Sequence, residues 1–363
     1  MKVGLFASNE YPYPLPPGKI QAALAMAGLI ADGLTDLGEE VMFFCSEDSE
    51  TKANKISLRY HSMYYNKVSK EILAMLPRNH VKTMNIQRMF SDVISYLQEN
   101  PVDVLHLHNI RETLPFLKFL PGVPKVITMH DSPFFPHHRY YLEQYKDVSD
   151  IHFVSISKNQ RRALSSDFSY AGNVYNGIDT QKFSFSSKPE DKLIFVGRFL
   201  KTKGVDTALH VAQRAKKDII TVGFFPWNEE KTSDFYQEVS ELLNKSNVEH
   251  YEHVSHETDI PRLFARAKAM LFPIRWEEPF GLTLIEAMAC GTPVIAFNRG
   301  SVSEVIKEGV TGFIVESEKE MIEAVKKIDN IDRMACRKHV EEHFTTEVMV
   351  KNYRNVYKKI IKK

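Results

Sequence analysis

"EEPFGLTLIEAMACGTPVIA", residues Glu277–Ala296, joins a short turn to a helical pattern and then to an apolar, β-branched run. If a helix begins at this turn, the free backbone N–H groups of its first residues form a site for an anion such as phosphate. Glu278 and Glu286 flank the turn, and their carboxylates would repel a phosphate. We therefore predict a ligand with both phosphates and hydroxyls, in which the hydroxyls donate hydrogen bonds to the carboxylates.

The alternation of helix and strand continues outward from this stretch over the whole chain. Longer helix-periodic patterns separate short apolar runs, and the first pattern, residues 20–38, ends at Gly38, as helices often do. The ten runs that predict strands are KVGLFAS (2–8), EVMFFCS (40–46), VDVLHLHN (102–109), KVITMHD (125–131), IHFVSIS (151–157), KLIFVGR (192–198), IITVGFF (219–225), VEHYEHV (248–254), AKAMLFP (267–273) and TPVIAF (292–297). This order predicts an α/β protein with parallel sheets covered on both faces.

The ten runs form two series, each about the size of one doubly wound unit. We expect two Rossmann-like domains, residues 1–175 and 176–344, joined at the turn-rich stretch Asn173–Lys192. In open parallel sheets, ligands bind beyond the carboxyl ends of the strands. Two facing units would place their loops around one interdomain cleft, so the residues that follow strands are the candidates for a site.

Length and composition limit the possible functions. The 363 residues fit two domains, and a net charge of +1 gives no argument for binding nucleic acid. The three cysteines lie far apart without a disulfide or metal spacing, and the apolar start is too short for a signal peptide. No apolar run is long enough to span a membrane. We expect a cytoplasmic protein.

Lysine pairs occur near the ends of helical patterns at Lys216-Lys217, at Lys326-Lys327 and in the terminal "VYKKIIKK". Cations at helix C-termini are the ordinary explanation, because they complement the helix dipole. The alternative is a weak peripheral association with the inner face of a membrane or with an acidic acceptor.

A basic loop follows the strand KLIFVGR. Arg198 and Lys203 lie five residues apart in "GRFLKTKG", before the next helix. A planar guanidinium and a compact ammonium together suit two phosphates, although a solvated basic loop is the alternative. Gly281, Leu282 and Thr283 would add backbone N–H donors if a helix begins there.

Glu278 and Glu286 each allow more than one interpretation. Glu278 and Glu286 suit paired hydroxyls, as acids do for ribose in dinucleotide folds. "TLIE" is also a capping box, with Thr283 as N-cap and Glu286 at the third position, and spacing alone favours this structural role. The pair could also form a glycosidase acid and base, but a hydrolase has no use for the neighbouring Arg and Lys. Glu277 is expected to be a surface acid.

The first half of the chain offers histidines. His130 and Asp131 end the strand KVITMHD, where His130 is either a donor to a ligand or a satisfied histidine at a strand end. His106 and His108 share one face of a strand, a placement more typical of packing than of metal ligation. "PHHRYY", residues 136–141, is expected to be an aromatic, basic loop that could meet an acceptor, although loops of that kind are common.

Several cofactor motifs are absent. The loop after the first strand lacks G-x-G-x-x-G, which argues against a nicotinamide enzyme. Neither a phosphate-binding P-loop nor a G-x-S-x-G elbow occurs. No acidic D-x-D follows a convincing strand, so we expect no cofactor and no obligatory metal.

"EPFGLTLIEAMACGTPVIA" resembles the signature of the retaining glycosyltransferases of family 4, whose E-x7-E pair matches Glu278 and Glu286. Further matches follow the family's order along nearly the whole chain, strongly in the C-terminal half and loosely in the N-terminal half. They are TMHD (128–131), NGID (176–179), GR (197–198), KG (203–204), GSVSEVIKEGVTGFIV (300–315) and FTTEVMVKNYRNVYKKII (344–361). The resemblance implies the GT-B fold, with two facing Rossmann-like domains, and a last helix, about residues 345–363, that crosses back onto the first domain.

The resemblance also implies residue roles. Arg198 and Lys203 would hold the donor diphosphate, and Glu286 would bind the ribose hydroxyls instead of only capping a helix. Glu278, with the backbone of Phe280 and Gly281, would hold hydroxyls of the transferred sugar, and His130 would reach that sugar from the other domain. In the resulting set of roles, Glu278, His130, Arg198 and Lys203 are catalytic, and the donor site comprises Gly18, Arg198, Lys203, Glu278, Phe280, Gly281, Leu282, Thr283 and Glu286.

One position departs from the family's pattern. The family usually has a Gly-Gly turn after the first strand, whereas this chain reads "YPLPPGKIQAA", with Gly18 followed by Lys19. Gly18 still allows a close approach of the backbone to a ligand. Lys19 adds a charge that would contact phosphate, contact an acidic acceptor or point to solvent.

These observations predict a retaining transferase that moves a hexose from a nucleotide diphosphate sugar, with UDP-sugars expected first and GDP-sugars next. The acceptor would be a glycan, a lipid-linked molecule or a small molecule. The resemblance implies a front-face reaction in which the leaving phosphate helps to deprotonate the acceptor. The alternatives are a non-catalytic sugar-nucleotide-binding partner of a glycosylation complex, and a nucleotide-sugar epimerase or glycosidase.

Overall fold

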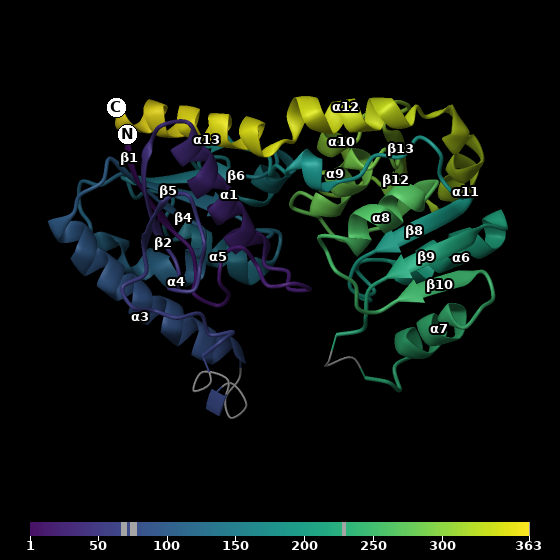
Figure 1. The fold of residues 1–363 in the computed structure, drawn as a ribbon, viewed down its shortest axis with the longest axis horizontal. Helices are drawn as coiled ribbons and strands as arrows, with labels where there is room; N and C mark the ends of the chain where they lie inside the picture. Colours follow the sequence, from purple (N-terminus) through teal and green to yellow (C-terminus); the bar gives the residue numbers. More distant parts are fainter. Residues whose placement is uncertain (67–70, 73–77, 227–229, 363) are drawn as a thin grey trace. The chain divides into compact units, whose positions relative to one another are not determined.

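The computed structural model describes residues 1–66, 71–72, 78–226 and 230–362. The chain divides into two compact units (Figure 1). The first unit comprises Met1–Gly177 and Thr346–Lys363, and the second comprises Ile178–Thr345. The boundary between Gly177 and Ile178 lies within the turn-rich stretch Asn173–Lys192.

The first unit is built on a parallel sheet of seven strands in the order β3-β2-β1-β4-β5-β6-β7. Its strands are β1 (Lys2–Phe6), β2 (Glu40–Phe44), β3 (Asn54–Ile56), β4 (Val104–Leu107), β5 (Lys125–Met129), β6 (Ile151–Ser155) and β7 (Tyr170–Asn173). Its helices are α1 (Ala22–Asp36), α3 (Arg78–Glu99), α4 (Ile110–Thr113), α5 (Pro136–Glu143) and α13 (Thr346–Ile361), with 3-10 turns η1 (Leu114–Phe119) and η2 (Asn159–Ala163).

The second unit repeats this plan with a parallel sheet of six strands, in the order β10-β9-β8-β11-β12-β13. Its strands are β8 (Lys192–Val196), β9 (Asp218–Val222), β10 (Val248–Tyr251), β11 (Ala269–Phe272), β12 (Val294–Phe297) and β13 (Gly312–Val315). Its helices are α6 (Val205–Ala215), α7 (Asp234–Leu243), α8 (Asp259–Arg266), α9 (Leu282–Ala289), α10 (Val302–Val305), α11 (Glu318–Lys327) and α12 (Arg333–His343), with η3 (Thr180–Lys182) and η4 (Ile328–Asn330).

Alternation of side chains along the strands explains the two layers of helices in the first unit. Leu105 and Leu107 of β4 belong to an apolar cluster that contains most of the buried residues of α3 and those of η1. His106, between them, points to the other face, where the Tyr357 hydroxyl of α13 contacts it. The last helix therefore covers the face of the sheet opposite to α3, and it also packs against α1.

The α/β fold class with two Rossmann-like units is confirmed, and each of the ten predicted runs overlaps a strand. Strands β3, β7 and β13 were not predicted. The prediction of a loop at "PHHRYY" is wrong: Pro136 takes the first position of α5, where its fixed φ and missing N–H suit a helix start. The three cysteines are free and buried. Among the described residues, no helix combines the length and apolarity needed to cross a bilayer.

Candidate functional site

The strand order reverses at the centre of each sheet, between β1 and β4 in the first unit and between β8 and β11 in the second. At such a switch point, the connections from neighbouring strands run to opposite faces, and ligands of doubly wound sheets bind there. Arg198 and Lys203 follow β8, and Glu278 follows β11. The structure therefore brings these predicted residues to one edge of the second sheet.

The helix predicted after the Phe-Gly turn begins where an anion site requires it. Gly281 is the N-cap of α9, with φ of 79°, a left-handed conformation that an L side chain would strain. Leu284 donates its N–H to Gly281, which leaves the N–H groups of Leu282 and Thr283 at the open end of the helix. The Phe280 side chain is buried, so only its backbone is left to meet a ligand.

Lys203 and Glu278 converge across this edge. The Lys203 ammonium lies 2.7 Å from a Glu278 carboxylate oxygen and 4.9 Å from the centroid of the Trp276 ring. Both charged side chains are largely buried, with 21% and 12% of their area exposed. Within the described residues Arg198, by contrast, is exposed and has no side-chain hydrogen bond or ion pair.

Arg275 ties the two loops of this edge together. Its guanidinium donates to the Lys201 carbonyl, to Asp206 and to Thr207, at 2.9, 2.6 and 2.6 Å, and its backbone N–H donates to the Thr202 carbonyl. The loop that carries Arg198 and Lys203 is therefore fixed to Arg275, in the segment that follows β11. This support helps to hold charged side chains in place.

Glu286 lies in the second turn of α9, and its side chain is 5% exposed. One carboxylate oxygen, Oε1, lies 3.1 Å from Nε2 of His256, and the other, Oε2, is buried without a hydrogen-bond partner in the described structure. The hydrogen bond with Glu286 raises the pKa of His256, although burial opposes this. The capping box favoured by spacing is wrong, because the helix starts two residues earlier, at Gly281, and Glu286 is turned toward His256.

Glu277 has a structural role, so its prediction as a mere surface acid is wrong. Its carboxylate accepts the N–H of Gly300 at 2.9 Å. Ser301 adds hydrogen bonds to the carbonyls of Glu278 and Phe280, at 3.0 and 2.8 Å. A Cβ on Gly300 would lie 2.3 Å from the Glu278 backbone, so only glycine permits this contact. The loop before α10 therefore fixes the turn that starts α9.

In the first unit, the ends of β4 and β5 carry a network of three histidines. His108 Nδ1 lies 2.7 Å from His130 Nε2, and the ring of His106 lies 4.2 Å from that of His108. His106 bonds the Thr128 hydroxyl and the Tyr357 hydroxyl, at 2.8 and 2.6 Å. The strand therefore brings His106 and His108 together as predicted, and Tyr357 of α13 contacts His106.

Burial keeps these histidines neutral. It lowers the pKa of His106 to about 3 and that of His130 to about 4, and the pKa of His108 falls well below its usual value. At neutral pH, a neutral imidazole can donate a hydrogen bond from one nitrogen and accept one at the other. Gln160 fixes the turn at His130, because its amide donates to the carbonyls of Met129 and Asp131.

The loop after β1 carries the departure from the family's pattern. Gly18 is exposed, with φ of 72°, and a Cβ there would meet nothing within 4 Å. The Lys19 ammonium lies over the Tyr64 ring, 5.5 Å from its centroid. Lys19 therefore leans on an aromatic side chain of the first unit.

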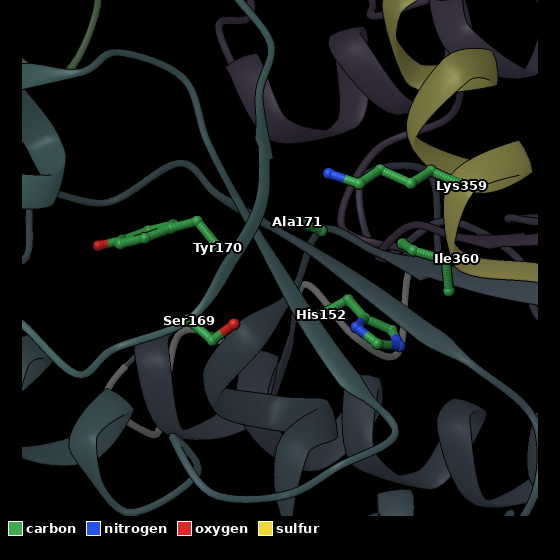
Figure 2. A pocket seen from close by; sticks show the side chains of 6 residues that line it. All are labelled: His152, Ser169, Tyr170, Ala171, Lys359 and Ile360. Carbon is green, nitrogen blue, oxygen red and sulfur yellow. The ribbon is translucent and has the colours of Figure 1, made fainter. Parts of the chain in front are cut away.

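A small pocket elsewhere in the first unit contains none of the predicted site residues. Side chains of β6, of β7 and of α13 surround it (Figure 2). Its lining residues are His152, Ser169, Tyr170, Ala171, Lys359 and Ile360. The candidate site therefore does not include this pocket.

Sequence reasoning missed His256, Arg275 and Gln160. His256 follows β10 and Arg275 follows β11, so the rule that ligands bind beyond strand ends would have marked both positions. Neither residue has a motif of its own, and their partners lie 30 to 74 positions away in sequence. No local signal indicates Gln160.

Each half of the chain matches a family of glycosyltransferases. Residues 178–341 match the family described as Glycosyl transferases group 1, and residues 26–182 match the one described as Glycosyltransferase Family 4. An uncharacterized 41.2 kDa protein in the cps region of Klebsiella pneumoniae is 29% identical over 76% of this chain and 84% of its own.

Solved structures of similar fold span the whole chain. Sucrose-phosphate synthase from Thermosynechococcus elongatus has a TM-score of 0.75 at 17% identity, over 99% of both chains. The Anabaena protein HepE, solved in complex with UDP and glucose, has a TM-score of 0.70 at 16% identity, over 99% of this chain and 100% of its own. These likenesses establish the GT-B fold class.

Proposed function

Because the chain is a group 1 glycosyltransferase with the GT-B fold, we propose that it moves a hexose from a nucleotide diphosphate sugar to an acceptor hydroxyl, with retention at the anomeric carbon. Retention rests on the E-x7-E pair, Glu278 and Glu286, which resembles the signature of the retaining enzymes of family 4.

The observation that carries the proposal is the unpaired carboxylate oxygen of Glu286. A buried acceptor without a partner costs about 1 to 3 kcal/mol, more when the group is charged. Oε2 of Glu286 is such an acceptor, and it lies near the N-terminus of a helix. The two hydroxyls of a ribose would satisfy it, while the phosphates of the same nucleotide bind the helix N-terminus.

The charges around α9 suit a departing diphosphate. As the bond to the sugar breaks, negative charge grows on the phosphate oxygens. Arg198, Lys203 and the N–H groups of Leu282 and Thr283 would stabilise that charge, a contribution of the oxyanion-hole kind. Because the protein supplies these cations itself, we expect binding and transfer without a metal ion. Glu278 and His130 are proposed to hold hydroxyls of the transferred sugar.

For the donor we propose a UDP-sugar first and a GDP-sugar next. HepE, a protein of the same fold, was solved in complex with UDP and glucose, which supports the choice of a UDP-sugar. The acceptor is proposed to be a glycan, a lipid-linked glycan or a small molecule.

A thermal-shift panel tests the proposal. UDP, GDP, ADP and TDP, with their common sugars, are added to the protein in EDTA. A ligand at 100 times its dissociation constant adds about 2.7 kcal/mol to the free energy of unfolding, so one base should stand out. Glu286→Gln should remove that shift. Glu241→Gln, which changes an exposed acid of α7 in the same unit, should keep it. Well-folded protein that no nucleotide stabilises would refute the proposal.

A further inference from the structure

A half-exposed histidine accompanies the buried Glu286. His256 lies in the loop between β10 and α8, and its side chain is 42% exposed. Its Nε2 lies 3.1 Å from Oε1 of Glu286. In the described structure, His256 is the hydrogen-bond partner of Oε1 of Glu286. The other carboxylate oxygen, Oε2, has no hydrogen-bond partner there. No family motif of the sequence includes this position.

The contact restricts how the carboxylate can turn. The terminal torsion of a glutamate side chain is broad, so a free carboxylate would rotate among several orientations. A hydrogen bond to Oε1 selects one of them and leaves Oε2 for another donor. A protonated imidazole would also lower the cost of burying the carboxylate charge.

We propose that His256 is a positioning residue for Glu286, which holds its carboxylate so that Oε2 accepts hydrogen bonds from the ribose of a nucleotide. The inference rests on the proposed function and extends it to how the site selects ribose. The hydrogen bond with Glu286 raises the pKa of His256, with a further contribution from Glu257, and therefore favours the protonated imidazole.

Two substitutions separate the hydrogen bond from the bulk of the ring. In His256→Gln, the amide nitrogen takes a position close to that of Nε2, so the bond to Glu286 is kept. In His256→Asn, the amide reaches only as far as Nδ1, so that bond is lost. His253→Ala is the matched control, because His253 lies in the same loop and contacts the Phe224 ring instead of Glu286.

The experiment is isothermal titration calorimetry in EDTA with UDP and GDP, each beside its 2′-deoxy form. For the base that binds, we expect wild-type protein to favour the ribose form by about 10- to 100-fold, the value of one hydrogen bond to a charged group. His256→Asn should bring this ratio close to one, with a smaller loss of affinity for the 2′-deoxy form, whose 3′-hydroxyl also meets Oε2, and His256→Gln should restore most of the ratio. His253→Ala should leave the ratio unchanged.

The outcomes distinguish the two proposals. If wild-type protein discriminates and His256→Asn keeps the full ratio, the inference about His256 is wrong and the proposed function stands. If His256→Asn weakens both forms equally, or Gln fails to restore the ratio, the histidine only supports the fold and the inference is also wrong. If wild-type protein binds neither nucleotide, the proposed function fails and the inference with it.

Discussion

Arg198 and Lys203 follow the same strand but have different surroundings. Lys203 is paired with Glu278, whereas Arg198 is exposed. An exposed cation that meets its partner only when charge develops contributes to the transition state more than to binding of the ground state. The two cations are therefore expected to have separable roles.

Arg198→Ala is expected to lower kcat about 100- to 1000-fold, the range seen when one donor to a developing oxyanion is removed, with a much smaller change in KM. Steady-state kinetics with the donor found in the panel would measure both. Lys201→Ala removes an exposed cation from the same loop and should behave like wild type. A change confined to KM in Arg198→Ala would show that the guanidinium only binds the donor.

Residue types were easier to predict than their partners. The acids and cations after strands could be proposed because chemistry and strand-end placement point the same way. The state of Glu286 could not be predicted, because spacing fits a capping box as well as a ligand site. A left-handed glycine at 281 and a histidine 30 positions away decide between the two.

The buried histidines near the ends of β4 and β5 are expected to make the first unit less stable at low pH. His106 and His130 have native pKa values of about 3 and 4, below the ordinary value of about 6.5 expected in the unfolded chain. At a pH between the native and the unfolded pKa of a histidine, the unfolded state binds more protons than the native state. The free energy of unfolding therefore falls as the pH is lowered through this window. Each histidine contributes about 1.4 kcal/mol per pH unit in this window.

Amide hydrogen exchange of peptides covering β4 and β5, compared between pH 6.5 and pH 4.5, would measure this effect once the intrinsic exchange rates are corrected for pH. We expect His106→Gln to show a pH dependence smaller by about one proton than wild type. His343→Gln, in which the histidine is exposed, should show the wild-type dependence. An identical dependence in all three proteins would contradict the assignment of a buried, neutral His106.

Most elements with a strong local signal were predicted, although the apolar strand β13, with the sequence GFIV, was missed. Apart from β10, the strands that were predicted consist mostly of buried apolar residues, whereas β3 has three residues and only one apolar side chain. β7, with the sequence YAGN, has no such pattern either. The stretch "PHHRYY" was predicted to be an aromatic, basic loop, but Pro136 starts helix α5 there.

At the scale of the whole molecule, two units repeat one strand order with different residues. Pattern alone predicted this repeat, because alternation of strands and helices leaves few arrangements of a parallel sheet. The place of α13 did not follow from any pattern. Its Tyr353 and Tyr357 bond Thr128 and His106, 225 and 251 positions away, and only the family resemblance predicted that this helix joins the first unit.

The stereochemistry of the released sugar tests the central claim most directly. Without an acceptor, the enzyme is expected to hydrolyse its donor slowly, and proton NMR resolves the anomers before they equilibrate. With UDP-α-glucose, or the corresponding α-linked donor of the base selected in the panel, retention predicts that the α-anomer appears first, in EDTA and faster than in Arg198→Ala. Initial release of the β-anomer would contradict a retaining transferase, and equal rates in wild type and Arg198→Ala would contradict the site.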